Sequence, residues 1–151
     1  MNHNWSILCK KSVIEAESNV ISLLELMEKI TIGQRIASTG SVIVPNQFVM
    51  PLDFELVSHF SGISKNNVKP FLKVELFNKQ SEKMGQTEHE LKINSNAKTL
   101  RSRVIFNGVK IKGEGTYTFK VSLKENEKGS YKEVANIPLE IEIMKPNALL
   151  K

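Results

Sequence analysis

The stretch "GTYTFKVSLK", residues 115–124, decides the fold because apolar and polar side chains alternate along it. A β-strand with one buried face needs this alternation, since successive side chains point to opposite faces. The inward set is Tyr117, Phe119, Val121 and Leu123. Each of these side chains, fully buried, would stabilise the fold by about 1.5–3 kcal/mol. The stretch predicts a strand over 116–124.

The same period of two recurs along most of the chain. Residues 137–143 carry four alternating aliphatic side chains, and we expect them to pair antiparallel with 116–124. Pro138 cannot donate to a ladder, so it predicts an edge or a bulge. Residues 48–60, 72–76 and 89–93 alternate too, and the polar residues 78–86 predict a hairpin loop.

The N-terminal region predicts two strands within 5–23, joined by the polar turn "EAESN" at 15–19. Residues 22–30 also fit a helix, because Leu23, Leu24, Met27 and Ile30 have helical spacing. The β-branched residues on both sides favour strands instead. Helix and strand both remain open for 22–30.

Residues 103–112 also have two interpretations. In the first, they form a hairpin that turns at Asn107 and Gly108, which would place Arg103 opposite Lys112. In the second, they form one strand with a bulge at Gly108. The bulge would let Val104 and Phe106 point inward, and Val109 and Ile111 as well. The sequence does not choose between them.

A local resemblance supports an all-β fold. Gly115, Tyr117 and Phe119 resemble the segment that opens strand F of immunoglobulin-like domains, where a tyrosine corner precedes a cysteine. Phe119 stands at the cysteine position, which excludes the inter-sheet disulfide. The segments "WSILC" (5–9), "NVISL" (19–23), "GTYTFKV" (115–121) and "IPLEIEI" (137–143) resemble those of small uncharacterised bacterial β-sandwich proteins. This resemblance implies a fold and carries no activity.

These patterns together predict an antiparallel immunoglobulin-like β-sandwich of about eight or nine strands. The 151 residues, 40% hydrophobic and 25% charged, suit one domain over 1–144, followed by a C-terminal tail, 145–151. A lone cysteine forms no internal disulfide, and no export signal or long apolar run is evident. We therefore expect a cytoplasmic protein without a membrane span.

The basic excess lies in one segment. Residues 91–113 hold six basic residues and no acid, whereas the rest of the chain holds 15 basic and 16 acidic residues. A basic surface can bind phosphates and other anions. The candidate anion-binding residues are Lys98, Arg101, Arg103, Lys110 and Lys112. A lysine-rich face paired with acids from elsewhere in the chain is the plainer interpretation.

The residues that could carry chemistry do not form a recognisable site. Gly113 and Gly115 lead into a strand, not a helix, so they do not predict a phosphate loop. Cys9 shares a strand face with Trp5 and Ile7, which favours a small buried residue over a nucleophile. Carboxylates such as Asp53 and Glu55 are expected on a solvated strand face, where acid–base work is not favoured. The sequence therefore predicts no catalytic residue, no metal ligand and no cofactor.

Two functions follow as hypotheses. The first is a non-catalytic protein-interaction module, acting on an unidentified protein partner or on a second copy of itself along an exposed sheet edge. The alternative is an anion-binding or nucleic-acid-binding domain that uses the surface of residues 92–112. Exposed aromatic rings would be needed to stack on single-stranded nucleic acid, and most aromatic side chains here alternate inward.

Overall fold

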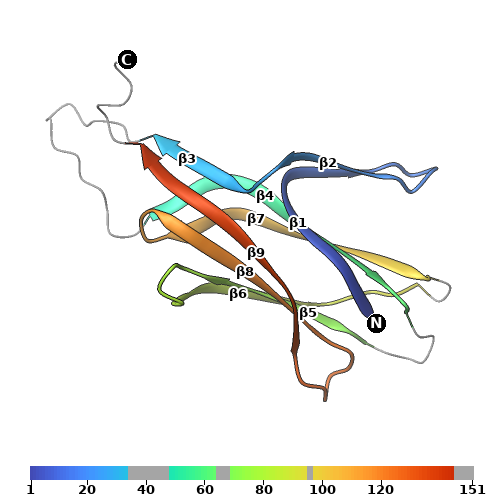
Figure 1. The fold of residues 1–151 in the computed structure, drawn as a ribbon. Coiled ribbons are helices and arrows are strands. Elements are labelled where there is room, and N and C mark those ends of the chain that lie inside the picture. The colour runs from blue at the N-terminus through green and yellow to red at the C-terminus, as the bar shows by residue number, and fades with distance from the viewer. Residues whose placement is uncertain (34–47, 64–68, 95–96, 145–151) are drawn as a thin grey trace, which may run out of the picture.

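Nine strands form two packed sheets in the computed structural model, which describes residues 1–33, 48–63, 69–94 and 97–144 (Figure 1). The predicted tail, 145–151, lies outside the described residues. The strands are β1 (Asn2–Ile14), β2 (Ile21–Leu26), β3 (Lys29–Gly33), β4 (Phe48–Ser61), β5 (Phe71–Phe77), β6 (Lys83–Glu90), β7 (Thr99–Ile111), β8 (Gly115–Lys124) and β9 (Lys132–Met144). Sheet A has the order β2-β1-β4-β7, and sheet B has the order β3-β9-β8-β5-β6.

The core lies between the two sheets and confirms the alternation in the sequence. Strand β8 buries all four of its predicted inward side chains, and Phe119 and Val121 are fully inaccessible. Strands β8 and β9 pair antiparallel, as predicted, with Tyr117 opposite Leu139. Three phenylalanines from both sheets meet in the core, where Phe54 stacks on Phe106 at 4.9 Å between ring centroids and both rings contact Phe119 edge-on. The fold is therefore all-β and sandwich-like.

The prediction that the strands are all antiparallel is wrong at one edge of sheet B. Strand β3 pairs parallel with β9, with Lys29 opposite Glu140 and Gly33 opposite Met144. After β2 the chain leaves sheet A and joins sheet B, and it then runs in the same direction as β9. The same segment settles the ambiguity at 22–30, because residues 21–26 and 29–33 are strands.

Residues 103–111 belong to one strand, β7, and not to a hairpin. Strand β7 pairs antiparallel with β4 along its length, and the register shifts between Met50 and Asp53. Gly108 lies opposite this shift and has φ +86°, a conformation that L side chains resist. Two residues of β4, at positions 51 and 52, thus lie opposite one residue of β7, and Val104 and Val109 both face the core although they are five positions apart.

The turn between β5 and β6 is shorter than the predicted loop at 78–86, because residues 83–86 belong to β6. The Asn78 side chain closes this turn by accepting hydrogen bonds from the amides of Gln80 and Glu82. These hydrogen bonds from the turn to the buried Asn78 side chain hold a short turn, where the polar sequence predicted a longer loop. Strand β6 therefore begins early and places Gly85 opposite Leu76.

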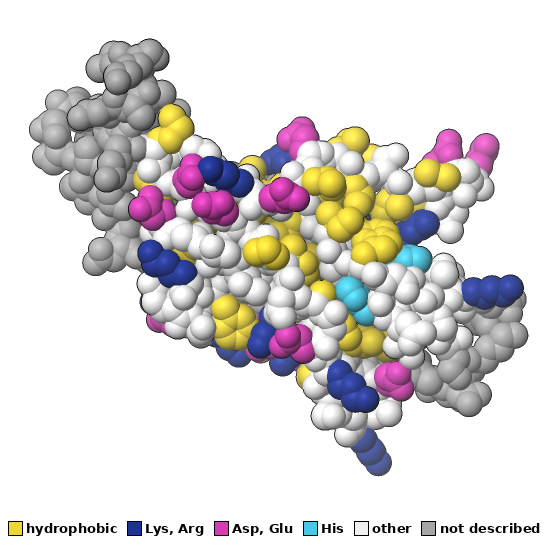
Figure 2. Space-filling view, in the orientation of Figure 1, with side chains coloured by type: hydrophobic (Ala, Val, Ile, Leu, Met, Phe, Trp, Pro, Cys, Tyr) yellow, Lys and Arg dark blue, Asp and Glu magenta, His cyan; other side chains and the backbone are white. Residues whose placement is uncertain are grey.

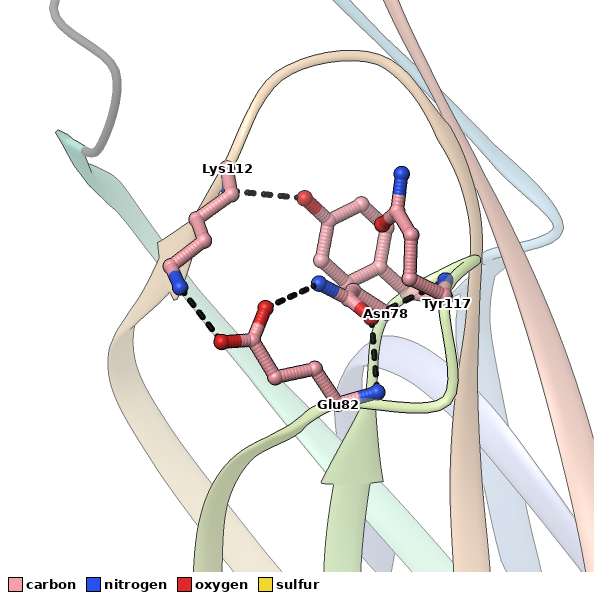
Figure 3. A network of polar contacts seen from close by, with 5 residues as sticks. Asn78, Glu82, Lys112 and Tyr117 are labelled. Atoms are coloured by element: carbon pink, nitrogen blue, oxygen red, sulfur yellow. Dashed lines mark hydrogen bonds and ion pairs between the residues drawn. The ribbon is translucent and has the colours of Figure 1, made fainter.

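A polar cluster joins this turn to the start of β8 (Figure 3). The Tyr117 hydroxyl accepts a hydrogen bond from the Lys112 amide at 2.8 Å and donates one to the Gly113 carbonyl at 3.0 Å. The Lys112 ammonium lies 2.7 Å from a carboxylate oxygen of Glu82. A hydroxyl bonded to the backbone a few residues upstream is the geometry of a tyrosine corner. Lys112 thus holds this corner and the β5–β6 turn together.

Candidate interaction surface

The β1–β2 hairpin carries most of the exposed apolar side chains. Seven large hydrophobic residues are exposed in the described chain, and five of them belong to this hairpin. They define the hairpin surface: Val13, Ile14, Val20, Leu24 and Leu26. Hydrophobic side chains gather over β1 and β2 in Figure 2. Because apolar residues exposed singly are ordinary on monomers, the concentration of five in one hairpin marks a candidate interaction surface.

Strand β2 is also an edge of sheet A, since only β1 pairs with it among the described strands. Its sequence, "ISLLEL", has neither the lysine nor the proline that commonly protect an edge. Glu25 has φ +52°, which makes the backbone irregular near the end of the strand. The regular part of the free edge is therefore Ile21–Leu24.

The hairpin folds back across the outer face of sheet A. The side chain of Arg101, on β7, donates hydrogen bonds to the Asn19 carbonyl at 2.7 Å and to the Asn19 side-chain oxygen at 3.1 Å. Asn19 lies in the hairpin turn, whereas β4 separates β1 from β7 in the sheet. The turn can reach Arg101 only by passing over β4.

Glu55 lies beneath the hairpin and is only 8% exposed, so the expectation that it would be solvated is wrong. One of its carboxylate oxygens accepts hydrogen bonds from the Ser12 amide, at 2.8 Å, and from the Ser12 hydroxyl. The other lies 3.8 Å from the Arg103 guanidinium. Alternation correctly put Glu55 on the outer face but could not show that another part of the chain covers that face. Glu55 attaches β1 to sheet A by charge-assisted hydrogen bonds.

The predicted anion-binding residues are spread along β7. Arg101 binds the hairpin turn, Arg103 lies beside Glu55, and Lys112 pairs with Glu82. Lys98 and Lys110 are exposed and have no ion pair among the described residues. Since a strand rises about 3.3 Å per residue, Arg101 on β7 and Lys112 just after its end, eleven positions apart, are separated by roughly 36 Å. The structure does not gather the five residues into one compact site, and anion binding stays a prediction.

Cys9 is completely buried, but on the opposite side of sheet A from the core residue Leu8. Burial, and then the nearby Glu55 charge, raise the pKa of the Cys9 thiol. A raised pKa keeps the thiol protonated and weakens it as a nucleophile. Cys9 is buried, as the sequence predicted. It is not part of the core that lies between the two sheets, because its side chain points to the outer side of sheet A.

The histidines serve local contacts. His3 shares a hydrogen bond with Ser6, His59 stacks against Trp5 at 5.4 Å, and His89 shares a hydrogen bond with Ser102. Burial lowers the pKa of His3 and of His89, which favours neutral imidazoles. No group of three or more His, Cys, Asp or Glu residues within the described ranges is placed to hold a metal ion.

The outer face of sheet B has a different character. Its lysines lie over aromatic rings, as Lys120 does over Phe77 at 5.3 Å and Lys124 over Phe71 at 4.5 Å. The same lysines reach carboxylates, with Lys120 3.0 Å from Glu133. The ring of Phe77 is therefore covered by a cation and is not open for stacking on a base.

The sequence did not reveal the hairpin surface. A signal was present, because Val13–Ile14, Val20–Ile21 and Leu23–Leu24 are adjacent apolar pairs, and a strand cannot bury both members of such a pair on one face. In the sequence, Leu23 and Leu24 counted towards helical spacing and the β-branched residues towards strands, so neither feature indicated a surface.

Comparison with known proteins gives no family for this chain. No protein-family model matches the sequence, and the search of curated proteins found no significant match. The resemblance to small bacterial β-sandwich proteins stays a prediction. Within the described residues, no helix is long and apolar enough to cross a membrane.

Proposed function

We propose that this protein is a non-catalytic interaction module whose β1–β2 hairpin associates with a second copy of the chain. The observation that carries the proposal concerns the described residues: five of their seven exposed large hydrophobic side chains lie on the hairpin, and none of their other strands pairs with the outer edge of β2. A free edge offers unpaired backbone groups, and apolar side chains beside it supply the driving force for association.

The proposed contact pairs β2 with β2 of the second copy, antiparallel about a twofold axis. Such an interface uses the same surface on both chains, so one apolar edge is sufficient. Ile21–Leu24 would form the new ladder, since the backbone is irregular at Glu25. Leu24 and Leu26, 47% and 60% exposed, would lose contact with water.

Sedimentation velocity at protein concentrations that span about a hundredfold tests the proposal, because association depends on protein concentration. We expect the wild type to shift from monomer to dimer, and the double variant Leu24→Asp with Leu26→Asp to remain a monomer. Val49→Asp is the matched control, because Val49 is 57% exposed but lies on β4, away from the hairpin. A wild type that stays monomeric throughout contradicts self-association, as does a double variant that dimerises normally.

We also infer that the sandwich is immunoglobulin-like. In such domains the sheet with strands C, F and G is extended in variable types by strand C′, and the tyrosine corner opens strand F. The order β9-β8-β5-β6 corresponds to G-F-C-C′ if β8 is strand F, and Tyr117 lies at the start of β8. The adjacent pair β4 and β7 then corresponds to B and E. Superposition of an experimental structure on immunoglobulin-like domains tests this assignment.

A further inference from the structure

A cavity of about 260 Å³ opens between β6 and β7, away from the hairpin. These strands are the facing edges of sheets B and A, and no ladder joins them among the described strand pairs. Two side-chain contacts connect them at either end. His89 and Ser102 share a hydrogen bond of 3.1 Å, and Lys112 lies 2.7 Å from Glu82 in the turn before β6. The cavity occupies the gap between these contacts.

Small residues on β6 create this space. Gly85 pairs with Leu76 and Thr87 pairs with Val74, so both occupy inward positions of the strand. The corresponding positions of β5 and β8 carry large apolar side chains. A Cβ atom added to Gly85 would meet no atom within 4 Å. The sequence thus leaves the core unfilled at this edge.

The cavity wall is mainly apolar. Its core-facing residues are Val74, Leu76, Val104, Phe106, Val109 and Phe119. Phe106 packs against the core but is only partly buried, because one side of its ring borders the gap. Apolar cavities of about 150 Å³ can hold benzene. The space between β6 and β7 is larger and can accept the body of an apolar molecule.

The cavity entrance has a defined charge. Lys110 is the one charged residue among those that line the cavity, and Gln86 and Thr87 add neutral polar groups. No carboxylate of the described residues forms an ion pair with Lys110. An apolar cavity with one cation at its rim complements a molecule that is apolar at one end and singly negative at the other.

We propose that the cavity between β6 and β7 binds a medium-chain fatty acid, with the chain inside the cavity and the carboxylate at Lys110. The site is separate from the hairpin surface, and its occupation does not require self-association. Binding would bury the exposed side of Phe106 and provide Lys110 with a charge partner.

Isothermal titration calorimetry with decanoate, below its micelle concentration, tests the proposal. We expect saturable binding of decanoate to the wild type and weaker binding of decan-1-ol, which lacks the charge. Lys110→Glu should weaken decanoate binding about fivefold, because an exposed ion pair contributes an effect of this size to affinity. The same substitution should leave decanol binding unchanged. Lys98→Glu is the matched control, since it makes the same charge change in the same basic segment outside the cavity.

Gly85→Leu tests the cavity itself, and the thermal unfolding of this variant shows whether it is folded. A leucine at this position should fill the space, abolish binding of both ligands and raise the midpoint of thermal unfolding. Gly33→Leu, on β3, should leave binding unchanged. The proposal is overturned if decanoate does not bind the wild type, if folded Gly85→Leu binds decanoate as tightly as the wild type, or if Lys110→Glu binds it equally well.

Discussion

The outer faces of the two sheets differ in whether their apolar side chains are covered. On sheet B, the rings of Phe71 and Phe77 lie beneath lysine side chains, and the lysines in turn reach carboxylates. On sheet A, the hairpin presents Leu24 and Leu26 to solvent without such cover. One face is adapted to water, whereas the other retains apolar area that a partner can bury.

The two faces also differ in how they are held. Sheet B uses ion pairs between side chains. The exposed ones, such as Lys29–Glu142 and Lys120–Glu133, contribute little individually, whereas Glu75 is buried between Lys73 and Lys83. The hairpin on sheet A is attached through Glu55, which is buried and accepts hydrogen bonds from Ser12. Breaking the contact between Glu55 and the Ser12 amide should therefore cost more than breaking an exposed ion pair of sheet B, and variants can test that ranking.

The largest effect is expected for Glu55→Ala. The substitution leaves the buried Ser12 amide without an acceptor and removes the partner of Arg103, so the free energy of unfolding should fall by about 2 kcal/mol. Urea denaturation measures this change. Glu55→Gln is the control, because it retains an acceptor for Ser12 and should cost about half as much. Equal stability of Glu55→Ala and the wild type would show that Glu55 does not hold the hairpin.

A smaller effect is expected for Arg101→Ala, which removes the contact with the hairpin turn. The free energy of unfolding should fall by about 1 kcal/mol, the usual size for one hydrogen-bonded contact. Amide exchange at Glu15, whose N–H donates to the Val20 carbonyl, should accelerate as the turn loosens. Lys98→Ala serves as the control. Unchanged exchange in Arg101→Ala would argue that the turn is rigid without Arg101.

The smallest effect concerns the pH dependence of sheet B. Hydrogen bonding to Lys73, and then to Lys83, lowers the pKa of Glu75. A lowered pKa in the folded state means that the folded protein binds fewer protons than the unfolded chain, so stability is lost as the pH falls below the ordinary range for glutamate.

Glu75→Gln should therefore flatten the decline in stability between about pH 5 and pH 3 by a few tenths of a kcal/mol, measured by urea denaturation. Lys73→Met should flatten this decline more than Lys83→Met, because Lys73 makes the larger contribution. The opposite order of the two lysine variants would contradict this account.

The sequence predicted the features that depend on one strand at a time. Alternation at Tyr117–Leu123 identified β8 and its buried face, and one of the two interpretations left open for 103–112 placed a shift in alternation at Gly108. These predictions held because side-chain period and glycine conformation are local properties.

Features that depend on distant pairing were missed. The parallel partner of β3 and the burial of Glu55 follow from where the chain crosses between sheets, which period-two alternation does not encode. The cavity was missed for a related reason: Gly85 was assigned to a loop because its neighbours are polar, whereas it lies in a strand opposite Leu76.

The parallel contact between β3 and β9 joins residues more than a hundred positions apart in the chain. During synthesis, residues 29–33 emerge from the ribosome long before the strand that will pair with them. Contacts of such long range slow folding and prolong the exposure of unpaired strands. We expect the N-terminal strands to depend on chaperones until the last strand has been made, and truncation before residue 132 to yield an aggregating product.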